Sequence, residues 1–363
     1  MKYQDEYRDK DKVRKVLEKI KEISKKRVSL MEVCGTHTMS IFRNGIKDVL
    51  PKNIRLLSGP GCPVCVTPNE YIDKAIELAR RKNTVVVTFG DMVKVPGTSS
   101  SLEKEKADSG DVRIVYSPSE AVTFAEKEKN KEIVFLGVGF ETTSPTVAAA
   151  ILEAKEKGLK NFSVLCGHKL IPPAIEALLR SKDVDIDGFM LPGHVSVIIG
   201  ERAYKFVAFN YRKPAVIMGF EPLDIMTGIY MLVYQIEGNN ALIANQYKRA
   251  VTYAGNVAAL EMMDKVFAVA DSQWRGLGNI AKSGFKIREH YSDFDAEKKF
   301  DTLLAKVAAS KEDKNCICGD VLKGTKTPLD CKMFGKACTP EDPKGACMVS
   351  SEGTCAAYYK YRV

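Results

Sequence analysis

The chain has 363 residues, of which 45% are hydrophobic, so it can bury substantial cores and we expect two or three domains. Lysine and arginine outnumber aspartate and glutamate by 55 to 46, but the excess lacks interleaved aromatic residues, which argues against nucleic-acid binding. No apolar run approaches the roughly eighteen residues of a membrane span, and residues 1–27 are too charged for a secretion signal. We therefore expect a cytoplasmic protein whose ten cysteines serve metal or redox chemistry.

The first predicted element is an amphipathic helix over residues of about 9 to 26, where apolar residues recur at helical spacing. Short apolar runs then alternate with amphipathic stretches, which is typical of parallel sheets with helices on both faces. These runs predict strands at Ser29–Val33, Arg55–Leu57, Thr84–Phe89, Arg113–Tyr116, Ile133–Val138, Phe162–Leu165, Gly188–Leu191 and Ala215–Gly219.

The number of strands favours two Rossmann-like α/β domains, which we divide at the charged stretch near residues 127–131. The first would cover residues 29–127 and the second residues 128–238. A third domain would combine the N-terminal helix, 1–28, with residues 239–363. In that last part a long helical pattern runs from about Asn239 through Val269, and a glycine-rich loop at Trp274–Phe285 precedes a cysteine-rich tail.

Three of the four histidines stand where a predicted strand gives way to a turn: His37 in Cys-Gly-Thr-His, His168 in Cys-Gly-His-Lys, and His194 in Pro-Gly-His-Val. Ligands of open α/β sheets bind at these strand ends, although a single histidine there can simply satisfy a turn. Cys34 lies three residues before His37, so it is a candidate soft metal ligand or nucleophile, and a buried inert thiol is the alternative. The sequence assigns no role to Cys166 and His168.

Residues 58–65 form a stiff Gly/Pro turn that carries Cys62 and Cys65 as a C-x-x-C pair. A predicted helix follows at once, with Thr67-Pro68-Asn69-Glu70 read as its capping box, and its N-terminus would favour a thiolate. A redox dithiol is the leading interpretation; a metal-ligand pair or two structural thiols remain open.

Glu141 lies in Gly-Val-Gly-Phe-Glu-Thr-Thr between a strand and a helix that Ser144-Pro145 would begin. The motif lacks the last glycine of a dinucleotide fingerprint, so a nucleotide site is not expected. Its carboxylate and hydroxyls would present polar groups to a ligand, or alternatively cap the next helix.

Four cysteines lie near the C-terminus in a stretch too polar to bury a core without help. Their order, Cys-x14-Cys-x6-Cys-x16-Cys, lacks the short paired hooks of zinc sites and favours an iron–sulfur cluster over structural zinc, disulfides or free thiols. The four are Cys316, Cys331, Cys338 and Cys355, with Cys318 and Cys347 beside them.

Together these motifs resemble the HypD family of [NiFe]-hydrogenase maturation proteins, in the family's order and over essentially the whole chain. The resemblance rests on Cys34-Gly-Thr-His-Thr38, Gly59-Pro-Gly-Cys-Pro-Val-Cys65, Gly139-Phe-Glu-Thr-Thr143, Pro192-Gly-His-Val-Ser196 and the four-cysteine tail.

The resemblance implies a scaffold for the Fe(CN)2CO unit of the hydrogenase, which works with the chaperone HypC and accepts cyanide from HypE. Cys34 and a chaperone cysteine would hold the transient iron with its CN and CO ligands, and His37 would orient or support it. Glu141 and His194 would line the cleft and handle protons or cyanide. A [4Fe–4S] cluster would fall on the four tail cysteines, which makes the third domain an iron–sulfur domain.

The tail also resembles ferredoxin–thioredoxin reductase in pairing a cluster with nearby thiols. We infer that Cys318 and Cys347 form a dithiol relay between the cluster and Cys62/Cys65. On this interpretation the chain is an accessory maturation factor with redox activity rather than a turnover enzyme. The alternatives are an iron–sulfur thiol–disulfide oxidoreductase acting on a protein, and a zinc-stabilised binding module.

Overall fold

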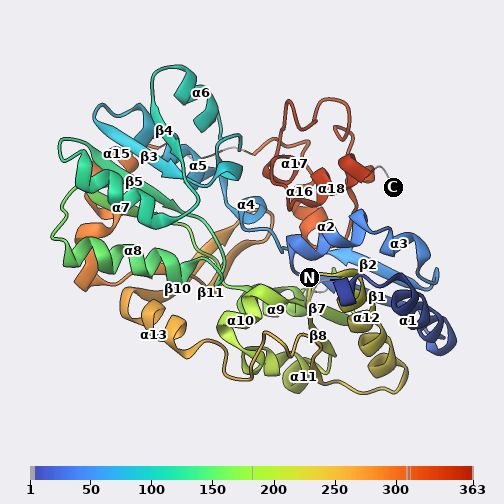
Figure 1. The fold of residues 1–363 in the computed structure, drawn as a ribbon. Coiled ribbons are helices and arrows are strands. Elements are labelled where there is room, and N and C mark those ends of the chain that lie inside the picture. The colour runs from blue at the N-terminus through green and yellow to red at the C-terminus, as the bar shows by residue number, and fades with distance from the viewer. Residues whose placement is uncertain (1–4, 182, 308–309, 311, 362–363) are drawn as a thin grey trace.

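Two parallel β-sheets form the frame of the computed structural model, which describes residues 5–181, 183–307, 310 and 312–361 (Figure 1). The first sheet has the strand order β2-β1-β7-β8-β9 and the second the order β4-β3-β5-β6. The strands of the first are β1 (Val28–Glu32), β2 (Ile54–Ser58), β7 (Gly188–Pro192), β8 (Ala215–Met218) and β9 (Ile243–Asn245). Those of the second are β3 (Thr84–Thr88), β4 (Asp111–Ile114), β5 (Glu132–Gly137) and β6 (Phe162–Cys166).

Helices cover both faces of the second sheet, and the middle residues of its central strands β3 and β5 are apolar on both faces. Val86 and Val134 pack on the side of α5, while Val85 and Phe135 pack on the side of α7 and α8. Neighbouring residues of one strand thus enter two different cores, as the two-residue repeat of a strand requires. The helices of this half are α4 (Pro63–Val66), α5 (Asn69–Arg80), α6 (Leu102–Ala107), α7 (Pro118–Lys127), α8 (Ser144–Glu156) and α9 (Ile171–Arg180).

The N-terminal helix belongs to the first sheet, where it packs on α12 and buries Ile20 in the core beneath β1 and β8. The Asp9 carboxylate accepts from two backbone N–H groups at its start, which stabilises that end. Helices of this half are α1 (Lys10–Ile23), α2 (Gly35–Arg43), α3 (Ile46–Val49), α10 (Gly193–Ile199), α11 (Lys205–Tyr211) and α12 (Pro222–Glu237).

The predicted fold class is confirmed: the chain is α/β, with parallel sheets flanked by helices, and all eight predicted strands are present. The expected division at residues 127/128 does not follow the sheets. Strand β3, which precedes it and pairs with β4, also pairs with β5 beyond it, while β1 pairs with the distant β7. The second sheet is therefore inserted between β2 and β7 of the first.

Residues 239–307 also differ from the expected helical region. Strand β9 completes the first sheet, and of the helix expected over residues 239–269 only Val257–Val266 is helical, as α13. An antiparallel hairpin of β10 (Phe267–Trp274) and β11 (Gly278–Ile287) follows, in place of the expected helix end and loop. Its alternating exposed and buried residues explain the error, since one face packs while the other meets solvent.

The C-terminal segment consists of short helices above α2 and α4 (Figure 1). The helices after the hairpin are α14 (Ala296–Lys299), α15 (Asp301–Leu304), α16 (Cys318–Leu322), α17 (Ala346–Val349) and α18 (Thr354–Tyr361). Short 3-10 helices lie at η1 (Asp5–Tyr7), η2 (Gly90–Met92), η3 (Glu201–Tyr204), η4 (Glu289–Phe294) and η5 (Pro328–Asp330). Within the described residues, no helix has the length and apolar character that crossing a membrane requires.

Two predicted helix starts differ in detail. The cap position of α5 is Pro68, and no side chain caps the helix there. The Thr67 hydroxyl, the predicted cap, donates to the Pro63 carbonyl instead. Helix α8 begins at Ser144 itself, whose hydroxyl donates to the Phe140 carbonyl. The predicted capping box is therefore wrong, while proline in the first turn of α8 is confirmed.

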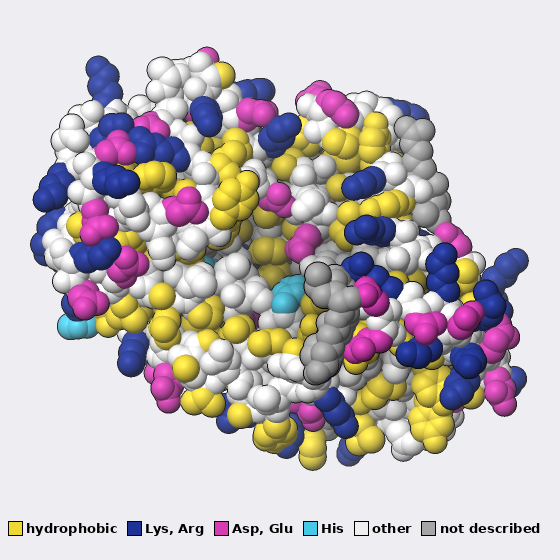
Figure 2. All heavy atoms as spheres, in the orientation of Figure 1, with side chains coloured by type: hydrophobic (Ala, Val, Ile, Leu, Met, Phe, Trp, Pro, Cys, Tyr) yellow, Lys and Arg dark blue, Asp and Glu magenta, His cyan; other side chains and the backbone are white. Residues whose placement is uncertain are grey.

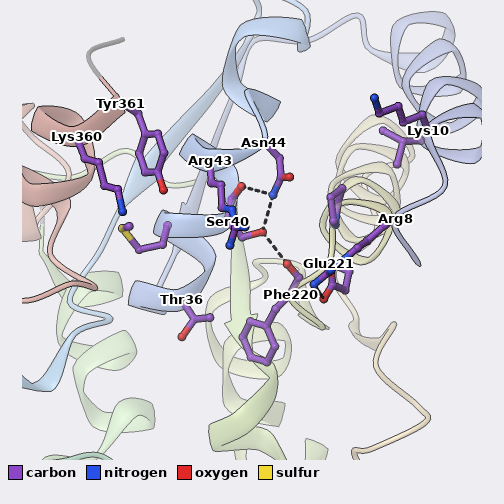
Figure 3. Close-up of a pocket in the computed structure, with 13 residues that line it drawn as sticks. Arg8, Lys10, Thr36, Ser40, Arg43, Asn44, Phe220, Glu221, Lys360 and Tyr361 are labelled. Atoms are coloured by element: carbon purple, nitrogen blue, oxygen red, sulfur yellow. Dashed lines mark hydrogen bonds and ion pairs between the residues drawn. The ribbon is translucent and has the colours of Figure 1, made fainter. Parts of the chain in front are cut away.

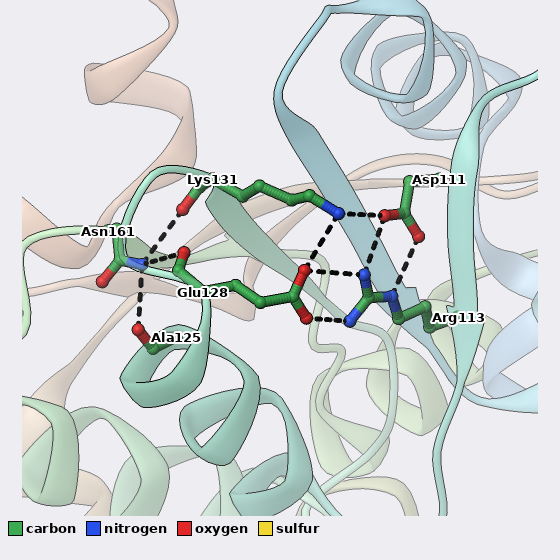
Figure 4. Close-up of polar contacts among 6 residues, drawn as sticks. All are labelled: Asp111, Arg113, Ala125, Glu128, Lys131 and Asn161. Atoms are coloured by element: carbon green, nitrogen blue, oxygen red, sulfur yellow. Dashed lines mark hydrogen bonds and ion pairs between the residues drawn. The ribbon is translucent and has the colours of Figure 1, made fainter.

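A network of charges ties strand β4 to the connection before β5 (Figure 4). The Arg113 guanidinium donates to both Asp111 carboxylate oxygens, at 2.9 and 2.8 Å, and also pairs with Glu128. Lys131 bridges the same two carboxylates, and Asn161 donates to the backbone carbonyls of Glu128 and Lys131. Hydrogen bonds from Arg113 and then Lys131 lower the pKa of Glu128 from 4.5 to about 2.

We expect Arg113→Met to lower the free energy of unfolding by about 1–2 kcal/mol at pH 7, because the bidentate pairs are lost at a half-buried site. The depressed pKa of Glu128 stabilises the folded state above about pH 4.5, and this contribution is lost as the pH falls through 2. The difference between wild type and variant should therefore shrink between pH 5 and pH 2. Urea unfolding followed through the single tryptophan, Trp274, measures it.

Arg14→Met is the control, since Arg14 and its partner Asp11 are largely exposed. An equal loss of stability in both variants, or a difference that does not depend on pH, would contradict the role of this network.

Candidate functional site

The carboxyl ends of strands from both sheets open into one cleft of about 290 Å³. Figure 2 shows a hollow in the middle of the molecule with a histidine side chain inside it. Its walls come from the segments after β2, β3, β5 and β7, and from the C-terminal segment, including Val64, Asp91, Phe140, His194 and Glu352. Parallel sheets place their strand-end turns at the same edge, so this cleft is the expected place for a ligand.

Cys34 follows β1 and occupies the cap position of α2. Burial, and then the nearby Glu352 carboxylate, hold the pKa of the Cys34 thiol well above its usual range, and the backbone N–H groups of His37 and Thr36 offset this only in part. His194 Nε2 lies 3.9 Å from Cys34 Sγ. The thiol thus stands beside a histidine that reaches the cleft, and burial lowers the pKa of that imidazole to about 4, so it is neutral at pH 7.

The predicted pairing of Cys34 with the His37 imidazole is not what the structure shows. His37 is fully buried, and its Nε2 donates to the carbonyls of Gly219 and Met218 at 2.9 and 3.2 Å. It supports the Cys34 sulfur through its backbone N–H alone. Both His37 and His194 pack against the ring of Phe220, so His37 acts behind the site rather than in it.

Glu32 is a functional residue that the sequence interpretation missed. Its buried carboxylate accepts the Cys34 N–H (3.0 Å), the Thr38 hydroxyl and the Ser58 hydroxyl. Burial raises its pKa to about 8. A single acidic residue at the end of an otherwise apolar strand was the available signal, since such a group is rarely buried without a partner.

The turn that carries Cys34 and the turn that carries Cys62 lie in direct backbone contact. The Gly35 N–H donates to the Gly61 carbonyl (2.8 Å), and a Cβ at Gly61 would lie 2.0 Å from the Cys34 nitrogen. Only glycine allows this approach. Position 61, in the motif of Cys62 and Cys65, must therefore be glycine so that the turn of Cys34 can pack against it.

The predicted dithiol pair has a geometry that suits disulfide formation. Cys62 Sγ and Cys65 Sγ lie 2.6 Å apart, and the Cys65 N–H donates to Cys62 Sγ (3.2 Å) at the start of α4. A disulfide bond of about 2.05 Å needs little further movement. Both residues are buried, at 3% and 0% exposure, so a large substrate does not reach either sulfur in this conformation.

Cys347, on α17, contacts three other cysteines. Hydrogen bonds from the thiols of Cys318, Cys355 and Cys65 hold the pKa of the Cys347 thiol well below its usual range. A continuous path of sulfur atoms thus runs from Cys62 through Cys65 and Cys347 to Cys318 and Cys355. The relay inferred from the sequence requires Cys318 or Cys347 to lie close to the Cys62/Cys65 pair, and the structure places Cys347 beside Cys65.

The four predicted cluster cysteines line one cavity together with Cys318 and Cys347. Its remaining wall is largely apolar, with Val321, Met333, Phe334 and Met348 among the lining residues. The Lys344 N–H donates to Cys338 Sγ at 3.3 Å, the kind of contact that adjusts the potential of a sulfur-bound cluster. Within the described part of the chain, no three potential ligands are arranged to hold one metal ion.

Glu141 faces away from the cleft, which its neighbours Phe140 and Thr142 line. One carboxylate oxygen accepts the Ile171 N–H (3.0 Å) at the start of α9, and the other has no partner among the described residues. Burial raises its pKa to about 8. Glu141 thus neither lines the cleft nor caps the next helix, α8; its carboxylate instead accepts at the start of the more distant helix α9.

Cys166, His168 and Lys169 form a separate group beneath the β10–β11 hairpin. Cys166 Sγ lies 3.5 Å from His168 Nδ1, and Lys169 donates to Ser272 Oγ (2.6 Å). Burial lowers the pKa of His168 to about 3 and that of Lys169 to about 8. None of the three lines the cleft. The histidine motif after β7 therefore faces the cleft through His194, whereas the similar motif after β6 packs under the hairpin.

Comparison with known proteins assigns the chain to a family. The sequence profile of the family described as "HypD: Hydrogenase formation hypA family" matches residues 11–362. The chain belongs to the HypD family. The hydrogenase maturation factors HypD2 of Bradyrhizobium diazoefficiens and HypD of Azotobacter vinelandii are 47% and 46% identical to it, each over 99% of this chain and 97% of the relative. HypD of Escherichia coli K12 is 43% identical over 100% of this chain and 98% of its own length. The resemblance to HypD is therefore confirmed.

We expect Glu32→Ala to expose Cys34, because three donors lose their acceptor and the turn opens more often. A loss of about 1.4 kcal/mol in the stability of the turn corresponds to roughly tenfold faster alkylation of Cys34 by iodoacetamide. Glu32→Gln should restore slow labelling, since an amide still offers an acceptor to the Cys34 N–H. Peptide mass spectrometry follows the reaction at this residue.

Glu22→Ala, on the exposed side of α1, controls for the loss of a carboxylate. Unchanged labelling of Cys34 in Glu32→Ala would show that the carboxylate does not hold the turn.

Proposed function

We propose that this member of the HypD family takes part in hydrogenase maturation as a scaffold on which the Fe(CN)2CO unit is assembled. The observation that carries the proposal is the buried Cys34 thiol, whose sulfur lies 3.9 Å from Nε2 of His194, a residue that lines the shared strand-end cleft. Cys34 would bind the iron as a thiolate, a soft ligand that suits iron bearing cyanide and carbon monoxide. The chaperone HypC would supply a second sulfur, and HypE would deliver cyanide.

His194 keeps the proton-handling role that the family resemblance implies for it, without Glu141, which lies outside the cleft. The neutral His194 imidazole is close enough to take the proton that Cys34 releases when iron binds. His37 supports the site from the side away from the cleft, where it packs on Phe220 and donates to the carbonyls of Met218 and Gly219. Glu352 accepts a hydrogen bond from Thr36 (2.6 Å), which fixes the first turn of α2 against the C-terminal segment.

We propose further that Cys316, Cys331, Cys338 and Cys355 hold a [4Fe–4S] cluster. The cluster takes one thiolate at each of four iron atoms, so its ligands surround a volume, whereas zinc needs four ligands that converge on one ion. Cysteines that line one cavity without forming a single-ion site support the cluster over zinc. A bound cluster would supply or accept single electrons in this segment.

Thiol exchange along the sulfur path is the redox chemistry that these residues support. The Cys347 thiolate would attack Cys65 Sγ of a Cys62–Cys65 disulfide and release Cys62 as a thiolate. Attack by Cys318 on Cys347 Sγ would then close a Cys318–Cys347 disulfide and release Cys65 as a thiolate. Two electrons would pass to the Cys62/Cys65 pair, and the reverse sequence returns them.

The alternative function, a thiol–disulfide oxidoreductase that acts on a protein, receives less support. Such an enzyme presents one sulfur to its substrate, and Cys62, Cys65 and Cys347 are all nearly inaccessible. Their burial favours exchange within the chain.

Cys34→Ala tests the proposed function. We expect the variant to fold and to keep its tail thiols unchanged, because Cys34 contributes little to either core. The complex with HypC, purified anaerobically, should lose the infrared bands of iron-bound cyanide and carbon monoxide, and hydrogenase maturation should stop. Cys166→Ala removes a thiol outside the cleft and should leave both unchanged. Bands of wild-type intensity in Cys34→Ala would rule out Cys34 as the iron ligand.

A further inference from the structure

A groove of about 670 Å³ runs along the outer face of α2, on the opposite side of the Cys34 turn from the cleft. Its floor is one side of that helix, at the helical repeat of Thr36, Met39, Ser40, Arg43 and Asn44. Figure 3 shows α2 in the middle, with the last turn of α18 on one side and the starts of α1 and α12 on the other. We call this feature the α2 groove.

Positive charge dominates the α2 groove. Lys10, Arg43 and Lys360 are exposed on its rim, and none of the three has an ion-pair partner among the described residues. The carboxylate of Glu221 also lines the groove, but Arg8 neutralises it through two hydrogen bonds, one of 2.8 Å. The three cations lie on different helices, so they are available to an anionic partner rather than to each other.

Apolar side chains lie between these cations. Val13, Met39, Phe220, Pro222 and Tyr361 line the same groove. A small inorganic anion would use the charges and leave these surfaces exposed to water, whereas a peptide that alternates acidic and apolar residues would cover both. Helix α2 has nine residues, or about 13 Å, the length of roughly four residues of extended chain.

The wall between the groove and the cleft is thin and consists of the residues around Cys34. Thr36 lines the groove and donates to Glu352, which lines the cleft. Phe220 lines the groove and stacks on His194 at 5.0 Å between ring centres. An occupant of the groove would therefore touch Thr36 and Phe220, which in turn contact Glu352 and His194 beside Cys34.

We propose that the α2 groove binds a short extended segment of a partner protein in which acidic residues alternate with apolar ones. Arg43 on the floor helix and Lys360 on the facing wall receive the carboxylates, and Met39 and Phe220 receive the apolar side chains. The segment would fix its protein against the wall that holds Cys34. This proposal rests on the proposed function in one respect: assembly of the iron unit at Cys34 gives a partner protein a reason to bind there.

The test uses the intact chain and a fluorescein-labelled hexapeptide of alternating glutamate and leucine, with a glutamine/leucine peptide for comparison. We expect the acidic peptide to bind at least tenfold more tightly than the neutral one in fluorescence anisotropy at low salt. Arg43→Glu combined with Lys360→Glu should weaken the acidic peptide at least tenfold. Lys82→Glu combined with Lys129→Glu makes the same change in net charge on the second-sheet half of the chain and should leave binding unchanged.

Equal binding of the two peptides, or equal effects of the two double variants, would overturn the proposal. Inorganic phosphate is the further comparison: if it displaces the peptide completely at concentrations near the peptide's own dissociation constant, the groove is a site for small anions and the proposal fails. None of these outcomes depends on iron, so infrared bands at Cys34 would still test the proposed function separately.

Discussion

The sulfur of Cys347 joins two parts of the molecule that are far apart in the sequence. It accepts hydrogen bonds from Cys318 and Cys355 in its own segment and from Cys65 beneath the first sheet. Without this contact the C-terminal cysteines and the Cys62/Cys65 pair would be separate groups with no chemical connection. Cys62, Cys65, Cys318 and Cys347 are buried, which keeps solvent thiols away and confines exchange among them to neighbours within the chain.

The turn that carries Cys34 depends on a second buried contact, the Glu32 carboxylate. It links the Cys34 turn to Ser58, the last residue of β2, immediately before the turn of Cys62. Gly61 then lets the two turns touch through their backbones. The proposed iron thiol and the proposed redox pair are thus held in one rigid unit, although 28 residues separate Cys34 from Cys62 in the numbering.

Sequence patterns predicted local features well, because each strand of a buried parallel sheet is a continuous apolar run. They could not reveal that β1 pairs with β7, since strand order depends on contacts across more than 150 residues. The hairpin at 267–287 was missed because its mixed apolar and polar residues also fit a helix followed by a loop. His37 is close to Cys34 in sequence, but helix α2 directs its ring to the carbonyls of Met218 and Gly219. His194, in the first turn of α10 after the neighbouring strand β7, lies beside the sulfur instead.

The most direct test of this account is to trap the contact between Cys65 and Cys347. In the triple variant Cys62→Ser, Cys318→Ser, Cys355→Ser, each of these two thiols has lost its other sulfur neighbours. One equivalent of diamide under anaerobic conditions should then form a Cys65–Cys347 disulfide, identified as a linked pair of peptides by mass spectrometry. If Cys65 remains free for alkylation while Cys347 pairs elsewhere or also stays free, the sulfur path does not exist in solution and the proposed exchange is wrong.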